Sequence, residues 1–569
     1  MVPTIRAARF FAALSALLSA VFFFPCFGNA QKASVAGLIG LVSSQEEGRM
    51  EGVLVSAKRD GSTITTTVVS DSQGRFSFPR NRLEGGEYSL TIRATGYEMD
   101  PVKLHLTSSK TATADLKLHK TQNLSAQLTS AEWLMSAPGT DEQKNVLLGC
   151  VICHTVERIF RSHHSADEFA QVRQRMGTYY EGTLPERPQL NPPRPAPVAG
   201  TPPIPSRFTP AEFQYMSTIN LSSAPQWQYP LKTTPRPTGK ATRVIFTQYD
   251  LPRKFAMPHD VVVGSDGMVW YSDHAQQYLG RLDPKTGAVV EYPLPVLKPG
   301  IATGLHFLEL DPDGNLWMSM GVQGGVARFD RKTQQFQTWK MPISREGEYP
   351  NAFTLLLGYL TVDGKVWLGE PAAGRIQRLD AHSGEWDREI IQPYRDIPKD
   401  SPMAAQSHLF YDTYADSRKN VYLTDISSGY IEKIDAKTLK VTAYQTPTPD
   451  SGPRRAHMDK QDRLWFGEYS GNKIGMFDTK TEQFQEWELP TPFSGPYDAV
   501  LDKDGYVWTG GMTTDRVTRL NPKTGEMVDY LLPRRTNIRR VEVDNSANPV
   551  AFWVGDNHGS SILKLEPLQ

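Results

Sequence analysis

Cysteine is scarce in this sequence, with 3 copies among 569 residues. So few thiols cannot build a disulfide framework. Positive and negative side chains balance to a formal net charge of zero, which gives no reason to expect binding to nucleic acid or to an anionic membrane. Beyond the N-terminus, no apolar run is long enough to cross a bilayer. We therefore expect no nucleic-acid partner and no membrane span in the mature chain.

The N-terminus has the pattern of a secretory signal peptide, which we place at residues 1–30. Arg6 and Arg9 form a basic start, an apolar run covers residues 10–24, and Gly28-Asn29-Ala30 offers small residues for cleavage. An uncleaved membrane anchor is the alternative, although the apolar run is short for a full span. The pattern predicts export across the inner membrane to the periplasm.

Cys150, Cys153 and His154 match the C-x-x-C-H signature of covalent haem attachment. Thiols one helical turn apart can add to the two vinyl groups of a haem, and the adjacent His then serves as proximal iron ligand. The alternatives are a redox-active thiol pair and half of a zinc site. Zinc would need a second ligand pair, and the third cysteine, Cys26, lies inside the predicted signal peptide. We therefore predict one covalent haem c.

Residues 124–223, around this motif, switch to helical signals. Three capping-box sequences mark expected helix starts, at Thr129 to Glu132, Ser165 to Glu168 and Thr209 to Glu212. A proline-rich stretch over 185–205 cannot be helical, and either wraps the haem as extended chain or is a plain linker. The segment predicts a small cytochrome c-like domain.

The sixth iron ligand is predicted at Met176. Phe169, Val172 and Met176 share one face of an expected helix, and a thioether ligand would raise the haem potential. Packing in an apolar core is the alternative role of this Met. The arrangement of Cys-His followed by Arg-Met also resembles the haem domains of quinohaemoprotein amine dehydrogenases, which favours Met176. His163 and His164 are further candidates, but the chain would have to double back to use them.

Residues 33–120 consist of short strand-like runs between Gly, Asp and Asn turns. The runs at 72–78, Ser-Gln-Gly-Arg-Phe-Ser-Phe, and 94–98, Ala-Thr-Gly-Tyr-Glu, resemble the carboxypeptidase regulatory-like family. The resemblance implies a small transthyretin-like β-sandwich and brings no catalytic constellation. We expect a structural or adhesive module, with weak glycan binding as the alternative.

Residues 241–569 form a repeat array. One aromatic marks each unit, at Trp270, Trp317, Trp367, Tyr422, Trp465, Trp508 and Trp553. Asp-Gly turns precede most of these markers, and glycine accepts the positive φ that such hairpin turns demand. Units of four short strands repeated in this way predict a seven-bladed β-propeller, so that the whole chain is mainly β.

Ring closure is also visible in the repeat pattern. The last unit ends near Leu565 without an outer strand, while a surplus strand at 249–252 precedes the first unit. We expect the surplus strand to complete the final blade and to leave no open edge.

The repeats, such as Pro258-His259-Asp260 followed by Asp266-Gly267 and Trp270, resemble the virginiamycin B lyase (streptogramin lyase) family over essentially all of the propeller. The resemblance implies elimination by a His base with Mg²⁺ held by two Glu. His259 and Asp273 fit the positions of the base and one carboxylate, and are the candidate catalytic residues. Met257 stands where the other Glu is expected, and no unit carries the whole signature. The drug-degrading activity is therefore not transferred to this chain.

Two sets of positions recur around the markers. Three positions after the aromatic, carboxylates are common, and Glu370, Asp425 and Glu468 are candidate ligands of Mg²⁺ or Ca²⁺. The alternative is that these carboxylates satisfy backbone groups between blades. About eleven positions before the aromatic stand other polar and aromatic residues, which we expect at one mouth of a central channel: His259, His306, Tyr411, Arg454, Tyr497 and Arg540.

Three functions follow as hypotheses. The first is an exported electron-transfer protein or oxidoreductase, in which the propeller binds a redox partner protein or a small-molecule substrate. The second is a metal-dependent lyase with an accessory haem. The third is a non-catalytic protein that binds carbohydrate or protein.

Overall fold

The computed structural model describes residues 36–184, 186–191, 208–222, 224–342, 352–357, 362–395, 397, 400–406 and 408–568. The predicted signal peptide and most of the proline-rich stretch lie outside these residues. Among the described helices, none combines the length and the apolar character needed to cross a membrane.

The N-terminal segment folds as the predicted β-sandwich. Leu38, Val55, Phe76 and Phe78 lie in its core, and Phe76 and Phe78 alternate with exposed neighbours along β5. One sheet has the order β2-β1-β10-β7, with β5 and β9 also on β1, and the other contains β4-β3-β6-β8. The strands are β1 (Ala36–Ser44), β2 (Gly48–Arg49), β3 (Leu54–Arg59), β4 (Ile64–Val69), β5 (Arg75–Pro79), β6 (Gly86–Arg93), β7 (Tyr97–Met99), β8 (Val102–Leu106), β9 (Ala112–Thr113) and β10 (Leu116–Lys120).

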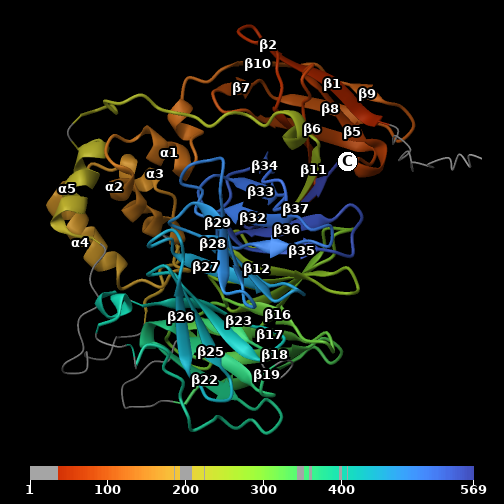
Figure 1. Cartoon of the computed structure of the whole chain (residues 1–569). Coiled ribbons are helices and arrows are strands. Elements are labelled where there is room, and N and C mark those ends of the chain that lie inside the picture. Colours follow the sequence, from red (N-terminus) through yellow and green to blue (C-terminus); the bar gives the residue numbers. More distant parts are fainter. Residues whose placement is uncertain are drawn as a thin grey trace, which may run out of the picture. The chain divides into compact units, whose positions relative to one another are not determined.

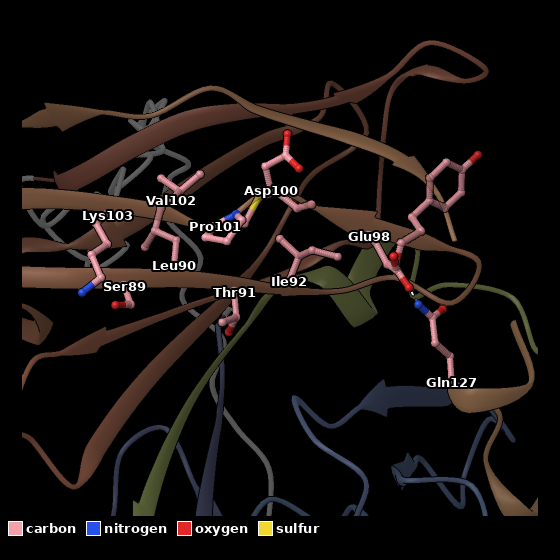
Figure 2. A pocket seen from close by; sticks show the side chains of 12 residues that line it. Ser89, Leu90, Thr91, Ile92, Glu98, Asp100, Pro101, Val102, Lys103 and Gln127 are labelled. Atoms are coloured by element: carbon pink, nitrogen blue, oxygen red, sulfur yellow. Dashed lines mark hydrogen bonds between the residues drawn. The ribbon is translucent and has the colours of Figure 1, made fainter. Parts of the chain in front are cut away.

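A groove of about 470 Å³ lies on this sandwich, between β6 and the β7–β8 turn (Figure 2). Its polar lining includes Glu98, Asp100, Lys103 and Gln127. The Gln127 amide is engaged, because its Nε2 donates to the Tyr97 carbonyl at 3.0 Å and its Oε1 accepts from the Gly96 N–H at 2.7 Å. Glycan binding to the sandwich stays a prediction.

The middle segment is helical, as the capping boxes predict. Glu132 and Glu168 accept hydrogen bonds from the Thr129 and Ser165 amides, both at 2.8 Å, and Glu212 does the same for Thr209. The helices are η2 (Leu124–Ala126), α1 (Ser130–Ser136), α2 (Asp141–Asn145), η3 (Val146–Ile152), α3 (Glu157–Phe160), α4 (Ala166–Met176) and α5 (Pro210–Ile219), where η denotes a 3₁₀-helix. The C-x-x-C-H motif therefore begins within the 3₁₀-helix η3 and ends just after it.

Seven antiparallel sheets follow, drawn from green to blue in Figure 1. Their strands are β12 (Pro258–Val263), β13 (Val269–Asp273), β14 (Tyr278–Leu282), β15 (Val289–Pro293); β16 (Leu308–Leu310), β17 (Leu316–Ser319), β18 (Gly325–Asp330), β19 (Gln335–Lys340); β20 (Thr354–Leu356), β21 (Val366–Glu370), β22 (Arg375–Leu379); β23 (Phe410–Ala415), β24 (Asn420–Asp425), β25 (Tyr430–Asp435), β26 (Val441–Gln445); β27 (Pro453–Met458), β28 (Arg463–Glu468), β29 (Lys473–Asp478), β30 (Gln483–Glu488); β31 (Val500–Leu501), β32 (Val507–Gly511), β33 (Arg516–Leu520), β34 (Met527–Leu531); and β35 (Ile538–Asp544), β36 (Ala551–Asp556), β37 (Ser561–Pro567) with β11 (Val244–Asp250).

The inner strands form a closed ring. Successive blades contact one another along the chain through at least one inner strand, and β12 of the first blade contacts β35 and β36 of the last. The predicted seven-bladed propeller is therefore observed, with one correction. Among its described residues the third blade has three strands, and there only the isolated bridges Ile376 to Ile391 and Leu379 to Trp386 stand where a fourth strand is expected.

Five of the seven marker aromatics donate a hydrogen bond to the turn before them. In four blades the indole Nε1 donates to an Asp of the preceding turn at 2.7 to 3.0 Å, and in a fifth the Tyr422 hydroxyl does so at 3.1 Å. The indole pairs are Trp317 with Asp311, Trp367 with Asp363, Trp465 with Asp459 and Trp508 with Asp502. One aromatic thus packs the blade and fixes its hairpin.

Strand β11 closes the ring as predicted, but its outer edge is also paired. It pairs antiparallel with β37 of the last blade and with β4 of the sandwich, which makes one eight-stranded sheet. Ile245 enters the sandwich core, whereas Val244 and Phe246 enter the core of the last blade. The expectation that β11 merely seals the ring is thus incomplete, because the same strand ties sandwich to propeller.

Candidate functional site

Side chains from the starts of the inner strands meet at one mouth of the ring. The Tyr411 and Tyr497 hydroxyls lie 2.5 Å apart, and the Tyr497 hydroxyl lies 3.3 Å from His259 Nε2. The Arg454 guanidinium lies over the rings of Tyr411, Tyr469 and Tyr497, at 4.8, 4.6 and 4.2 Å from their centroids. The predicted gathering of His259, Tyr411, Arg454 and Tyr497 is therefore observed.

The last blade differs from the prediction by one residue. Arg539, rather than Arg540, faces the mouth, where its guanidinium lies 5.9 Å from the Tyr497 ring centroid. Arg540 instead donates to the Leu308 carbonyl and pairs with Asp260 at 3.4 Å. Arg539 directly follows the first residue of its inner strand, as His259 and Arg454 do. The insertion before Trp553 is therefore one residue longer than the prediction allowed.

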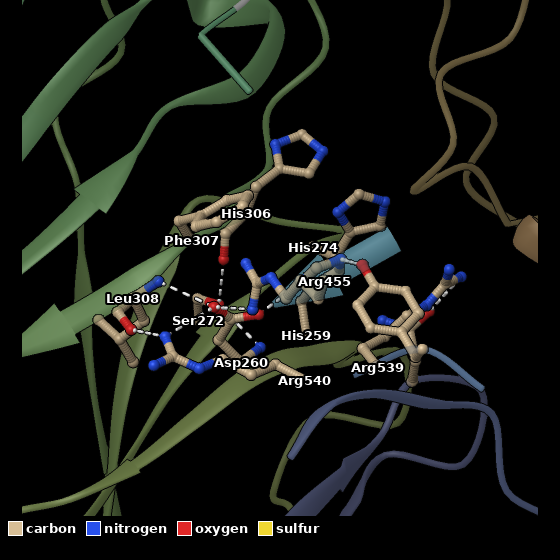
Figure 3. A network of polar contacts seen from close by, with 12 residues as sticks. His259, Asp260, Ser272, His274, His306, Phe307, Leu308, Arg455, Arg539 and Arg540 are labelled. Carbon is tan, nitrogen blue, oxygen red and sulfur yellow. Dashed lines mark hydrogen bonds and ion pairs between the residues drawn. The ribbon is translucent and has the colours of Figure 1, made fainter. Parts of the chain in front are cut away.

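Beneath the mouth lies a buried network of charges, shown in Figure 3. Asp260 pairs with Arg455 at 2.8 Å and accepts from the Leu308 backbone N–H at 3.0 Å. It also accepts from His259 Nδ1 at 2.7 Å. Burial opposes ionisation of Asp260, but Arg455 and His259 outweigh it and hold the pKa of this carboxyl well below its usual range. The network fixes the orientation of His259.

Three histidines cluster beside this network. The ring centroids of His259 and His274 lie 4.9 Å apart, those of His274 and His306 lie 4.7 Å apart, and all three side chains are buried. Burial lowers the pKa of His259 to about 4 and those of His274 and His306 well below the usual value. At neutral pH the three imidazoles are therefore uncharged and can act as bases or metal ligands.

The C-x-x-C-H segment is hydrogen-bonded to this same mouth. Tyr469 donates its hydroxyl to the Leu148 carbonyl at 2.8 Å, and Asn537 Nδ2 donates to the Val151 carbonyl at 3.1 Å. The Arg539 guanidinium donates to the Ile152 carbonyl. The helical segment and the mouth also share one core, in which Leu147, Leu148 and Val151 pack with Tyr411, Tyr469, Tyr497 and Met512. The motif is thus seated on the propeller.

Cys150, Cys153 and His154 fit covalent haem. Cys150 is half-buried and Cys153 is exposed, and both are free thiols. The surrounding protein raises their pKa values to about 11 and about 12, whereas reactive redox thiols have lowered values. His154 Nδ1 lies 2.8 Å from the Thr155 carbonyl, so that this nitrogen donates and Nε2 is left for iron. The attachment of haem stays a prediction.

Met176 is 37% exposed at the end of α4. One helical turn earlier, Arg173 is close enough to act on the pKa values of both thiols, and residues three apart on a helix share a face. Met176 therefore lies on the face of α4 that carries Arg173. His163 Nδ1 lies 2.9 Å from the Leu221 carbonyl, and the His164 ring packs edge-on against Phe169.

The pair proposed by the lyase resemblance, His259 and Asp273, has other partners. Asp273 is bonded to Arg253 and accepts from the Met257 and Ala275 backbone N–H groups at 3.1 and 2.9 Å. The carboxylate bonded to His259 is Asp260. Asp273 thus fills the backbone-binding role that the sequence leaves open as an alternative.

Two of the three candidate cation ligands have partners from their own blade or the loop before it, whereas neither carboxylate oxygen of Glu468 has a hydrogen-bond partner among the described residues. Glu370 pairs with Arg375, and Asp425 accepts from His408 at 2.6 Å and from the Leu409 N–H at 3.0 Å. Burial and the nearby Glu486 raise the pKa of Glu468 to about 9. Within the described part of the chain, Asp425 belongs to a group that could hold a metal, with His408 and Glu432, and this group contains neither Glu370 nor Glu468.

Comparison with known proteins supports two of the three segments. Residues 399–567 match the Virginiamycin B lyase family, and residues 37–119 match the carboxypeptidase regulatory-like domain. The chain is thus a mainly β protein in which both resemblances are confirmed over these segments. Among curated proteins, none is significantly similar to it.

Solved structures similar to this chain include virginiamycin B lyase from Staphylococcus aureus, at 20% identity, covering 57% of this chain and 99% of that chain with a TM-score of 0.46. A streptogramin B lyase structure is 19% identical and covers 58% of this chain and 99% of that chain, with a TM-score of 0.48. Likeness this distant says nothing about activity or substrate.

Sequence reasoning missed three residues of the mouth: Glu181, His274 and Arg539. His274 directly follows Asp273, one position beyond the recurrent carboxylate, and could have been found by extending the repeat alignment by one column. Glu181 carries no local signal, because it comes from the helical segment and reaches the histidines only through the tertiary fold.

Proposed function

We propose that this protein is an exported c-type haem protein whose haem, held by Cys150, Cys153 and His154, lies at the propeller mouth. There it exchanges electrons with a redox partner protein or with a small-molecule substrate. The observation that supports the proposal is how the motif is held at the mouth. The Val151 and Ile152 carbonyls accept hydrogen bonds from Asn537 and Arg539, and Tyr469 donates to the Leu148 carbonyl just before the motif. A haem attached here would contact the mouth of the propeller, where His259, Arg454 and Tyr497 meet.

When bound, the haem would supply one-electron chemistry at this mouth. The chain's own residues have separate tasks. His154 is oriented by the Thr155 carbonyl at 2.8 Å. Arg539 brings a buried positive charge next to the motif, which favours the reduced state of a neighbouring iron. Tyr497 continues the packed contact from Arg539 to His259.

The test is a spectroelectrochemical titration of the full chain, exported together with a c-type maturation system. We expect one reversible haem wave in the wild type and none in Cys150→Ala/Cys153→Ala. Arg539→Gln should lower the midpoint potential, because a positive charge next to the iron is removed. Arg463→Gln, whose partner Asp459 lies in a turn of the fifth blade, is the matched control and should leave it unchanged.

A wild-type chain without a haem wave would overturn the proposal. If the Arg539→Gln protein is folded and contains haem but keeps the wild-type potential, the haem does not lie next to Arg539 at the mouth. Melting curves of both Arg variants separate loss of folding from loss of the charge.

The Met176 prediction is tested by the same spectroelectrochemical titration. Met176→Ala should lower the haem potential, because a thioether ligand raises it. Met216→Leu, a change in the buried core of α5, should not. Equal potentials in wild type and Met176→Ala would exclude Met176 as the sixth ligand and leave the haem itself in place.

A further inference from the structure

One cluster at the mouth is not used by the haem proposal. Glu181, His274 and His306 each offer a ligand atom, and these atoms all lie within 4.8 Å of one another. His274 and His306 are each 1% exposed. Neither ring nitrogen of His306 has a hydrogen-bond partner among the described residues. A buried imidazole without a partner costs free energy unless something else satisfies it.

The loop that carries Glu181 is fitted closely to the propeller. Gln189 Nε2 donates to the Ala275 carbonyl at 2.7 Å, and the Thr303 N–H donates to Gln189 Oε1 at 3.1 Å. Glycines allow the close approach, because a Cβ on Gly182 or Gly304 would lie 2.3 or 2.2 Å from the His274 carbonyl oxygen. These contacts hold the loop that follows Glu181 against the chain around His274.

His274 and His306 lie side by side, with rings on the same side of the Asp260 network (Figure 3). The Tyr180 hydroxyl lies 3.4 Å from His274 Nδ1, the kind of contact that orients metal-binding imidazoles. The nearby His259 differs, because Asp260 at 2.7 Å and Tyr497 at 3.3 Å engage both of its ring nitrogens. His259 is thus a neighbour of the cluster rather than a ligand.

We propose that Glu181, His274 and His306 bind a divalent transition metal. Two imidazoles and one carboxylate form the ligand set that suits non-haem Fe²⁺ and also accepts Zn²⁺ or Mn²⁺, with positions left open for a substrate. The site is distinct from the predicted cation ligands Glu370, Asp425 and Glu468. It takes one ligand from the helical segment and two from the propeller. The proposal goes beyond the haem and does not depend on it.

Zinc is the probe, because elemental analysis counts it separately from haem iron. The full chain is dialysed against buffered Zn²⁺ and its zinc content is measured across a range of free zinc. We expect one Zn²⁺ per wild-type chain, and binding weakened about tenfold or more in His306→Ala and in Glu181→Gln. His382→Ala, in an exposed turn of the third blade, should bind as the wild type does.

Two further variants keep the outcomes distinct. Cys150→Ala/Cys153→Ala should keep its zinc, so that failure of the haem proposal and failure of this one can be told apart. Glu432→Gln tests the other metal-capable group, formed with His408 and Asp425, and should also keep its zinc. Glu181→Gln changes a half-buried side chain outside the strands, so a folding defect in His306→Ala leaves the test intact.

Wild-type chain that binds no zinc would overturn the proposal. So would zinc binding that is unchanged in both Glu181→Gln and His306→Ala, or zinc that is lost in Glu432→Gln alone.

Discussion

The marker tryptophans fall into two groups, according to whether the indole N–H has a hydrogen-bond partner. Trp508 Nε1 donates to Asp502 at 2.7 Å, whereas Trp270 Nε1 has no partner among the described residues. Both indoles are buried, and both lie under an arginine at 5.3 to 5.9 Å. The two positions therefore differ mainly in one hydrogen bond to a charged acceptor.

This difference gives a stability prediction. Trp508→Phe should cost about 1 to 2 kcal/mol more than Trp270→Phe, because only the first leaves a buried carboxylate oxygen without its donor. Urea unfolding of both variants measures the difference. Equal losses would mean that the markers recur for packing alone.

At the residue scale the sequence could locate positions better than roles. The carboxylate three residues after each marker was predictable, but cation binding and backbone binding were both open. Asp273, Asp425 and Asp556 each accept from backbone N–H groups around the start of their own blade, and Asp425 also belongs to a group that could hold a metal. The recurrence of a carboxylate at one position of the repeat does not reveal whether its partner is an ion or a backbone amide.

At the element scale, buried charges hold pairs of inner strands together. Arg455 of β27 pairs with Asp260 of β12 at 2.8 Å and lies 3.9 Å from Asp412 of β23. All three side chains are at most 1% exposed. One arginine thus connects three blades across the ring.

Arg455→Ala should destabilise the protein by about 3 to 5 kcal/mol, because it leaves Asp260 and Asp412 buried with one fewer counter-charge. Arg463→Ala breaks a partly exposed pair with Asp459 within one blade and should cost less than about 1 kcal/mol. Chemical denaturation compares the two. Similar losses of unfolding free energy in the two variants would show that the charges around Arg455 do not hold the blades together.

Elements with strong local signals were predictable from the sequence. The capping boxes begin helices at the expected residues, and the Asp-Gly hairpins mark the blades. The third blade was expected to have four strands, but the segment after β22 pairs only at isolated positions. The approach of Glu181 to His306 was invisible, because a contact between residues so distant in sequence has no period to find.

The whole molecule is tied together by β11. Its residues pair with β37 on one edge and with β4 on the other, and Arg93 of the sandwich pairs with Asp515 of the propeller at 2.6 Å. The helical segment adds to this, because its core includes propeller side chains. Three segments that are separate in sequence therefore share strands and cores.

We expect one cooperative thermal transition for residues 36–568, because no segment can unfold without exposing another's core. Differential scanning calorimetry of the full chain measures this. Two well-separated transitions, with the sandwich melting alone, would show that the β4–β11 pairing contributes little.

The proposed function depends on covalent haem at Cys150 and Cys153. Its most direct test is a reduced pyridine-haemochrome spectrum of the exported chain after acid-acetone extraction, recorded beside Cys150→Ala/Cys153→Ala. We expect a c-type haemochrome that stays with the wild-type protein and is absent from the variant. Haem that is extracted from the wild type, or no haem at all after co-expression with the maturation system, would contradict it.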